Sequence, residues 1–271
     1  MNTQDQAVSH QVFSLVMFGC ALFVVLTAVA MWFYPGGTYA DQSASGYSFS
    51  TNFFSELGMT VTRSGEPNTV SAILWFVAMS LAGAGLVLFF IAFRQFFTGS
   101  RWGRVLSGLG SVVGVFSGIC FVGVAFTPAN LFLGAHVRFV LWAFQAFPVA
   151  AILYAVAILR EPAYPDRYGW AFLGFAVLLV FYVILLIAGP GQDLRQGLVI
   201  QAAGQKIIVY ASIISIFIQP FMPDAASKMW EQLGFKEKIE DQTIKKDCTW
   251  GKKASDVKVN KKAPLFPRIS I

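Results

Sequence analysis

The sequence predicts an all-α membrane protein: a polytopic bundle of six transmembrane helices with a short interfacial helix and an extended or disordered tail. Three observations predict this class. The chain is 56% hydrophobic and only 13% charged, which is too apolar for a soluble protein. It contains six long apolar runs, and about 20 apolar helical residues are enough to cross a hydrocarbon core about 30 Å thick. Its Lys and Arg residues are unevenly divided between alternate loops.

The first span is expected at residues 12–34, where the Pro-Gly-Gly sequence at 35–37 ends the helix. A polar loop continues to residue 68. Its segment 52–58 carries three apolar side chains and is predicted to form a one-turn helix in the membrane interface, capped by Asn52.

The second and third spans, residues 69–93 and 105–126, are joined by a tight hairpin that carries arginines. A short Thr-Pro-Ala-Asn turn at 127–130 leads into the fourth span, residues 131–159. Pro148 predicts a kink in that helix, because proline removes a backbone donor and clashes with the preceding turn.

The fifth and sixth spans are expected at residues 169–188 and 198–221. We therefore divide the chain into a six-span transmembrane domain, residues 1–222, and a basic tail, residues 223–271. The tail is predicted to begin with a short amphipathic helix and to continue as an extended or disordered arm.

Orientation follows from the basic residues of the loops, because positively charged loops stay cytoplasmic. Five arginines on one side oppose two on the other: Arg94, Arg101, Arg104, Arg160 and Arg167 against Arg63 and Arg195. We therefore expect both termini in the cytoplasm, and the location to be a bacterial cytoplasmic membrane. The alternative is five spans, with the segment around Arg195 lying at the interface.

Small residues recur at intervals of three and four along the third span. They include Ser107, Gly110, Ser111, Gly114 and Gly118. Such a seam lets helix backbones approach closely in lipid, so we expect this helix at the centre of the bundle. The alternative is that the glycines line a path for a substrate.

Polar residues from three separate segments are predicted to meet on the non-cytoplasmic side. The candidate ligand-binding residues are Asn52, Ser55, Glu56, His136, Arg138, Gln205 and Lys206. Charges inside a membrane face the bundle interior and pair, so Glu56 is expected to pair with Arg138 or Lys206. One interpretation is a structural lid held by this ion pair. The other is an outward-facing site for a lipid headgroup or a small anion.

Signatures of known chemistry are absent from the sequence. There is no phosphate-binding glycine loop, no His-Glu zinc motif and no nucleophile elbow, so we predict no cofactor and no metal site. The net charge of +6 does not indicate nucleic-acid binding, because the basic residues lie in short loops and one tail. An enzyme would need an acid-base pair, and Glu56 with His136 is the candidate.

The tail is predicted to contact lipid or a protein partner. Its contact residues are Trp230, Lys236, Lys238, Lys245 and Lys246. Lysines near an anionic membrane surface gain about 1 kcal/mol each.

Two short motifs carry a resemblance to known proteins. Residues 52–58, Asn-Phe-Phe-Ser-Glu-Leu-Gly, and the turn at 127–130 followed by Ala135 and His136 resemble an uncharacterised domain-of-unknown-function family of small six-span membrane proteins. The chain is more distantly similar to the DRAM/Sfk-type group. The resemblance covers residues 12–221 and implies six helices with polar positions near Asn52 and His136, but no settled activity.

The leading functional hypothesis is a non-enzymatic accessory or structural subunit of a larger membrane protein complex, with membrane lipids and other protein subunits as partners. The alternatives are an outward-facing protein that binds or transports a lipid or small anion, and an intramembrane enzyme.

Overall fold

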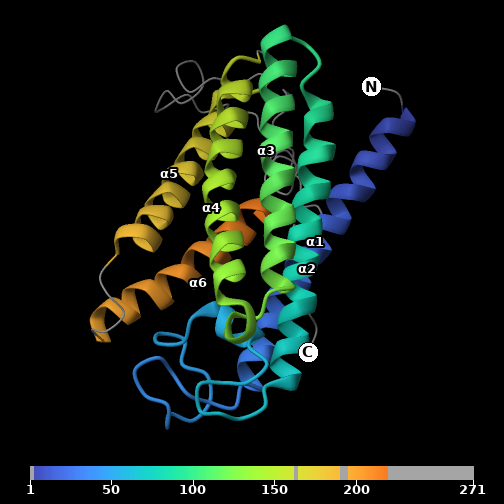
Figure 1. Cartoon of the computed structure of the whole chain (residues 1–271). Helices are drawn as coiled ribbons and strands as arrows, with labels where there is room; N and C mark the ends of the chain where they lie inside the picture. The colour runs from blue at the N-terminus through green and yellow to red at the C-terminus, as the bar shows by residue number, and fades with distance from the viewer. Residues whose placement is uncertain (1–2, 162–163, 190–194, 219–271) are drawn as a thin grey trace, which may run out of the picture. The chain divides into compact units, whose positions relative to one another are not determined.

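The computed structural model describes residues 3–161, 164–189 and 195–218. The described residues form helices and isolated bridges but no strand. The helices are α1 (Thr3–Trp32), η1 (Phe54–Gly58), α2 (Thr69–Phe93), η2 (Arg94–Phe96), α3 (Arg101–Ala125), α4 (Ala129–Leu159), α5 (Asp166–Ala188) and α6 (Arg195–Ile218) (Figure 1). Five of them, α1 to α5, contain a stretch long and apolar enough to cross a membrane. The all-helical class is therefore confirmed for the described residues, and these five helices are consistent with a membrane protein.

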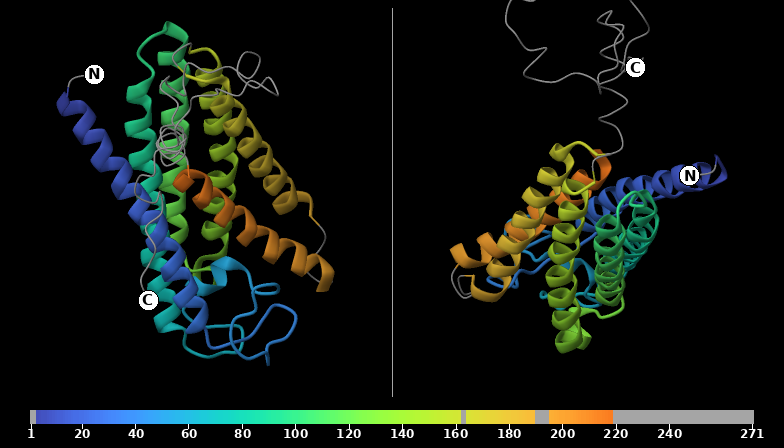
Figure 2. Two further views of the ribbon diagram at one scale, coloured as in Figure 1. Left: turned by 180° about the vertical axis from the view of Figure 1, so that it is seen from behind. Right: turned by 90° about the horizontal axis from the view of Figure 1, so that it is seen from above.

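Neighbouring helices in the chain are neighbours in space from α1 to α5. Each packs against the next, so α3 lies between α2 and α4. The three run side by side, whereas α6 is steeply inclined to them (Figures 1 and 2). Up to Ile214, α6 belongs to the same compact unit as the other helices.

Close contact between α2 and α3 rests on small residues. All five predicted seam residues are buried: Ser107, Gly110, Ser111, Gly114 and Gly118. A Cβ atom added to Gly118 would lie 2.9 Å from the carbonyl oxygen of Gly83 on α2, so only glycine allows this approach. The hydroxyl of Ser111 donates to the Phe90 carbonyl of α2 at 2.7 Å and lies 2.7 Å from the Tyr154 hydroxyl of α4.

Most helix boundaries lie within a few residues of the expected ones, whereas α1 begins at Thr3 instead of residue 12. Helix α2 spans Thr69–Phe93, as predicted. Helix α3 begins at Arg101, earlier than expected, because the Ser100 hydroxyl caps it by accepting from the Gly103 backbone N–H at 2.8 Å. A kink in α4 was expected at Pro148. The backbone dihedral angles stay helical there, and the kink lies at Phe132 instead (φ −131°, ψ 47°).

Residues 33–68 fold into a compact layer over one end of the bundle, which we call the cap (Figure 1). It begins where α1 ends, at two glycines with positive φ. At Gly37 (φ +85°) a side chain would also overlap the Ser64 backbone. Two isolated bridges, Gly36 to Ser45 and residue 61 to 67, close its turns.

The apolar side chains of η1 point into the protein. Phe54 and Leu57 are buried in a cluster with Phe23, Trp75 and Tyr210, in which the Phe54 and Trp75 ring centroids are 4.8 Å apart. The expectation that segment 52–58 inserts into the membrane interface was therefore wrong. A protein core and lipid are equally apolar, so composition alone does not distinguish the two locations.

Exposed tryptophans mark both ends of the helices. Trp32 lies at the capped end of α1 and is 86% exposed. Trp102 and Trp170 are exposed near the starts of α3 and α5, at the opposite end. Tryptophan is enriched at membrane–water interfaces, so this placement agrees with a membrane protein whose cap lies outside the hydrocarbon.

The C-terminal tail lies outside the described residues. This applies to the amphipathic helix predicted after residue 223 and to the predicted contact residues Trp230, Lys236, Lys238, Lys245 and Lys246.

Candidate functional site

The cap brings together residues from both ends of the sequence. At its edge, the Thr60 backbone N–H donates to Asn130 Oδ1 at 3.0 Å, and Asn130 Nδ2 donates to Thr60 Oγ1 at 2.8 Å. This reciprocal pair attaches the cap to the first turn of α4. The cap and the start of α4 therefore lie at one end of the bundle.

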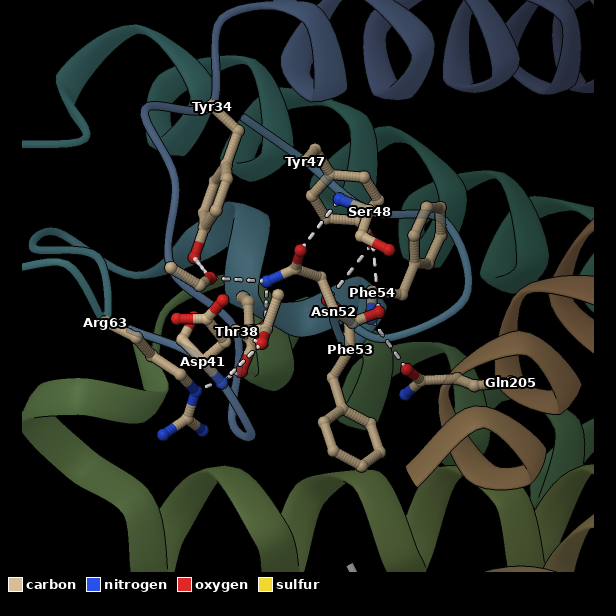
Figure 3. A network of polar contacts seen from close by, with 12 residues as sticks. Tyr34, Thr38, Asp41, Tyr47, Ser48, Asn52, Phe53, Phe54, Arg63 and Gln205 are labelled. Carbon is tan, nitrogen blue, oxygen red and sulfur yellow. Dashed lines mark hydrogen bonds and ion pairs between the residues drawn. The ribbon is translucent and has the colours of Figure 1, made fainter. Parts of the chain in front are cut away.

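Asn52 is the centre of the polar network inside the cap (Figure 3). Its side chain is fully buried, and its amide nitrogen donates to the Gly37 carbonyl at 2.8 Å and to Glu56 Oε2 at 2.6 Å. Its amide oxygen accepts from the Ser48 backbone N–H at 2.8 Å. Both N–H donors are thus used, and the amide ties three turns of the cap together. Asn52 does not cap η1, because the N-cap position belongs to Phe53.

Glu56 is buried on η1 and forms an ion pair with Arg63 of the same loop. The guanidinium carbon of Arg63 lies 4.5 Å from the ring centroid of Tyr39, which covers the pair. The predicted partners, Arg138 and Lys206, were wrong. Arg63 is seven residues away in sequence, so its approach costs less loop-closure entropy than pairing with a distant helix.

Two adjacent side chains of α6 hold the cap. Lys206 is fully buried, and its Nζ donates to the Asn52 carbonyl and, at 2.8 Å, to the Ala202 carbonyl. Gln205 Oε1 accepts from the Phe54 backbone N–H at 2.8 Å (Figure 3). Lys206 therefore bonds to backbone oxygens rather than to a carboxylate.

The two polar residues of α4 have different environments. His136 is buried, and its Nδ1 lies 2.6 Å from the Thr127 carbonyl. A carbonyl only accepts, so Nδ1 carries the proton. Among the described residues, Nε2 has no hydrogen-bond partner. Arg138 is exposed, so the structure does not bring it into the buried network.

The remaining polar groups of the cap are engaged locally. Asp41 Oδ1 accepts from the Ser43 backbone and hydroxyl at 2.9 and 2.7 Å, and these bonds lower the pKa of Asp41. Burial raises the pKa of Tyr47 well above its usual value, so its hydroxyl stays a donor, to the Phe53 carbonyl at 3.2 Å. Ser55 is half-buried on η1.

A second buried carboxylate, which the sequence analysis missed, lies at the opposite end of the bundle. Glu161 Oε2, just after α4, accepts from the Ser100 backbone N–H at 3.3 Å and from its hydroxyl at 3.1 Å. It thereby joins the α2–α3 hairpin to the α4–α5 loop. The signal in the sequence is Ser100, because serine favours the N-cap position and the apolar run of α3 follows it.

Comparison with known proteins adds little. No family model and no solved structure matches this chain. A stretch of 58 residues is 38% identical to part of a methionine–tRNA ligase from Halalkalibacterium halodurans, covering 21% of this chain and 8% of that enzyme. The overlap spans so little of the relative that it identifies neither a family nor an activity. The resemblance to six-span membrane proteins stays a prediction.

Proposed function

We propose that this chain is a non-enzymatic integral membrane protein that serves as an accessory or structural subunit of a larger membrane complex. One observation carries the proposal: three of the buried polar residues expected to bind a ligand, Glu56, Gln205 and Lys206, are bonded within the chain. Glu56 is neutralised by Arg63, Lys206 bonds to two carbonyls, and Gln205 bonds to the cap backbone. Buried polar groups that are satisfied in this way fix a structure rather than await a substrate.

In this proposal α6 is the sixth crossing, and both termini are cytoplasmic. Two contacts support the crossing: the Tyr210 hydroxyl lies 3.0 Å from the Thr27 hydroxyl of α1, and its ring centroid lies 6.5 Å from that of Phe23. Both α1 residues lie within the candidate span Ser14–Trp32, which supports a crossing by α6. The arginines of the loops opposite the cap support the orientation.

The contact surface we propose within the membrane is the outward face of α5. Only 17% of its apolar window is buried, the lowest share among the five candidate spans. Val177, Phe181 and Ile187 are each 63% exposed on this helix. An apolar helix face can meet lipid or another helix, so the proposal needs a test that separates the two.

Tryptophan substitution provides that test. A bulky side chain is tolerated where a helix meets fluid lipid but disturbs a packed helix–helix contact. We expect Val177→Trp on α5 to release protein partners when the full chain is extracted in mild detergent and separated by size under native conditions. The matched control is Val112→Trp on α3, since Val112 is similarly exposed at 68%.

Two outcomes contradict the proposal. If the wild-type chain migrates as a monomer without any protein partner, the accessory role is excluded. If the complex survives Val177→Trp and Val112→Trp equally well, α5 is excluded as the contact surface.

The second candidate is a protein that binds a small molecule near His136. The observation that favours it is the buried Nε2 acceptor, which has no partner among the residues that the structure describes, because leaving such an atom unsatisfied costs about 1–3 kcal/mol. An enzyme based on Glu56 and His136 has less support, since these side chains do not hydrogen-bond to each other and Glu56 is already paired.

A further inference from the structure

The head group of Lys206 sits in an enclosure built mainly by the cap. Its Nζ lies 5.4 Å from the ring centroid of Tyr47 and 5.2 Å from that of Phe49. The carbonyl oxygens of Asn52 and Ala202 accept its hydrogens. The lysine is 0% exposed, so these groups replace its hydration shell.

This combination of groups is the one that recognises an ammonium ion. Carbonyl oxygens accept the N–H hydrogens, and the faces of aromatic rings attract a cation within about 6 Å of the centroid. A hydrophobic side chain would gain nothing from the two carbonyls.

The enclosure is organised in advance by bonds that do not involve Lys206. The three side-chain hydrogen bonds of Asn52 fix the residue whose carbonyl receives the ammonium. Tyr47 is held by its own bond to the Phe53 carbonyl. Because these contacts lie within the cap, the walls of the enclosure are set by the loop, and α6 supplies the occupant.

We propose that the cap contains a binding site for a primary alkylammonium group, and that Lys206 fills this site from within the chain. The ligand class is an amine with a short, straight alkyl stem. Phe49 is 47% exposed, so one wall of the site borders the protein surface. The inference does not depend on the accessory role.

The consequence is that occupancy of the site attaches α6 to the cap. Removing the lysine side chain beyond Cβ leaves a space of the shape of n-propylammonium. An added amine should then restore the cap, whether it comes from solution or from the headgroup of an aminophospholipid.

The test uses full-length Lys206→Ala protein in phosphatidylglycerol nanodiscs and measures hydrogen exchange of the cap amides. We expect exchange to become about tenfold to a hundredfold faster than in the wild type. Saturating n-propylammonium should restore most of the protection, whereas 1-propanol, which has the same stem without the charge, should not. Lys206→Met is the matched control and should be loosened without rescue by the amine, because its own side chain fills the space.

Equal rescue by 1-propanol, or wild-type protection in Lys206→Met, overturns the proposal. Failure of n-propylammonium to slow exchange in folded Lys206→Ala overturns it as well. If Lys206→Ala does not fold, Phe49→Leu provides the test, because it keeps the lysine and an apolar side chain but removes the aromatic ring. Faster exchange of the cap amides in Phe49→Leu then supports the proposed site, and unchanged exchange contradicts it. Repeating the measurement in nanodiscs that contain phosphatidylethanolamine identifies whether a lipid headgroup supplies the amine, because protection then returns without added n-propylammonium.

Discussion

Replacing Asn52 by alanine should open the cap while leaving the helices in place. The substitution removes three hydrogen bonds: Glu56 Oε2 and the Ser48 N–H lose the partner they have now, and the Gly37 carbonyl keeps the Tyr34 hydroxyl at 3.4 Å. A hydrogen bond contributes about 1 kcal/mol net. For three such bonds, we expect the free energy of cap opening to fall by about 3 kcal/mol, which is about a hundredfold in the opening equilibrium.

Hydrogen exchange in nanodiscs measures this opening directly, because exchange through local opening reports its equilibrium. Amides of residues 36–58 should exchange about a hundredfold faster in Asn52→Ala, and those in the middle of α3 should not change. The control is Ser50→Ala, an exposed cap position whose hydroxyl only approaches the Ser48 hydroxyl at 3.3 Å. Wild-type protection of the cap in Asn52→Ala would refute the assignment of this amide as the centre of the network.

Three further predictions concern the rest of the bundle. Gly114→Leu should lower the free energy of unfolding by about 1–3 kcal/mol through overpacking, because even a Cβ there overlaps an aromatic ring of α2. The unfolding temperature should fall accordingly. Gly134→Leu, with open space around it, should leave that temperature nearly unchanged. Glu161→Gln should lose about 1–2 kcal/mol of stability in the same thermal assay, because a charged acceptor is replaced by a neutral one; an unchanged unfolding temperature would exclude its role. A membrane-impermeant maleimide should label Ser64→Cys from outside intact cells and should not label Thr98→Cys, and labelling of both from outside would refute the proposed orientation.

Much of the fold was accessible from local sequence patterns. A membrane-spanning helix satisfies its backbone hydrogen bonds internally, so an apolar run of sufficient length is enough to predict it. The second span shows how closely this works, since α2 was expected at 69–93 and spans Thr69–Phe93. Gln205 and Lys206 were expected at the same end as Asn52, and in the structure Lys206 bonds to Asn52 and Gln205 to the neighbouring Phe54.

The partners within the candidate site were harder to predict. Glu56 was expected to pair with Arg138 or Lys206, whereas in the structure it pairs with Arg63 in the same loop. The charges of several arginines and lysines are identical, so only their distances within the folded cap determine which one pairs. The role of Glu161 was not predicted, because its contact with Ser100 joins two loops that are far apart in sequence.

The amino-acid sequence alone predicts an all-helical class with apolar helices long enough to cross a membrane, and the bounds of α2 match while α1 and α3 begin earlier than expected. These features depend on hydropathy and on backbone hydrogen bonds between residues close in sequence. The inward packing of η1 and the bond of Lys206 to the cap backbone depend on how the folded chain brings distant residues together. An apolar side chain packs equally well against lipid or protein, and a buried charge bonds to whichever acceptor lies in suitable geometry, so sequence patterns do not choose between these contacts.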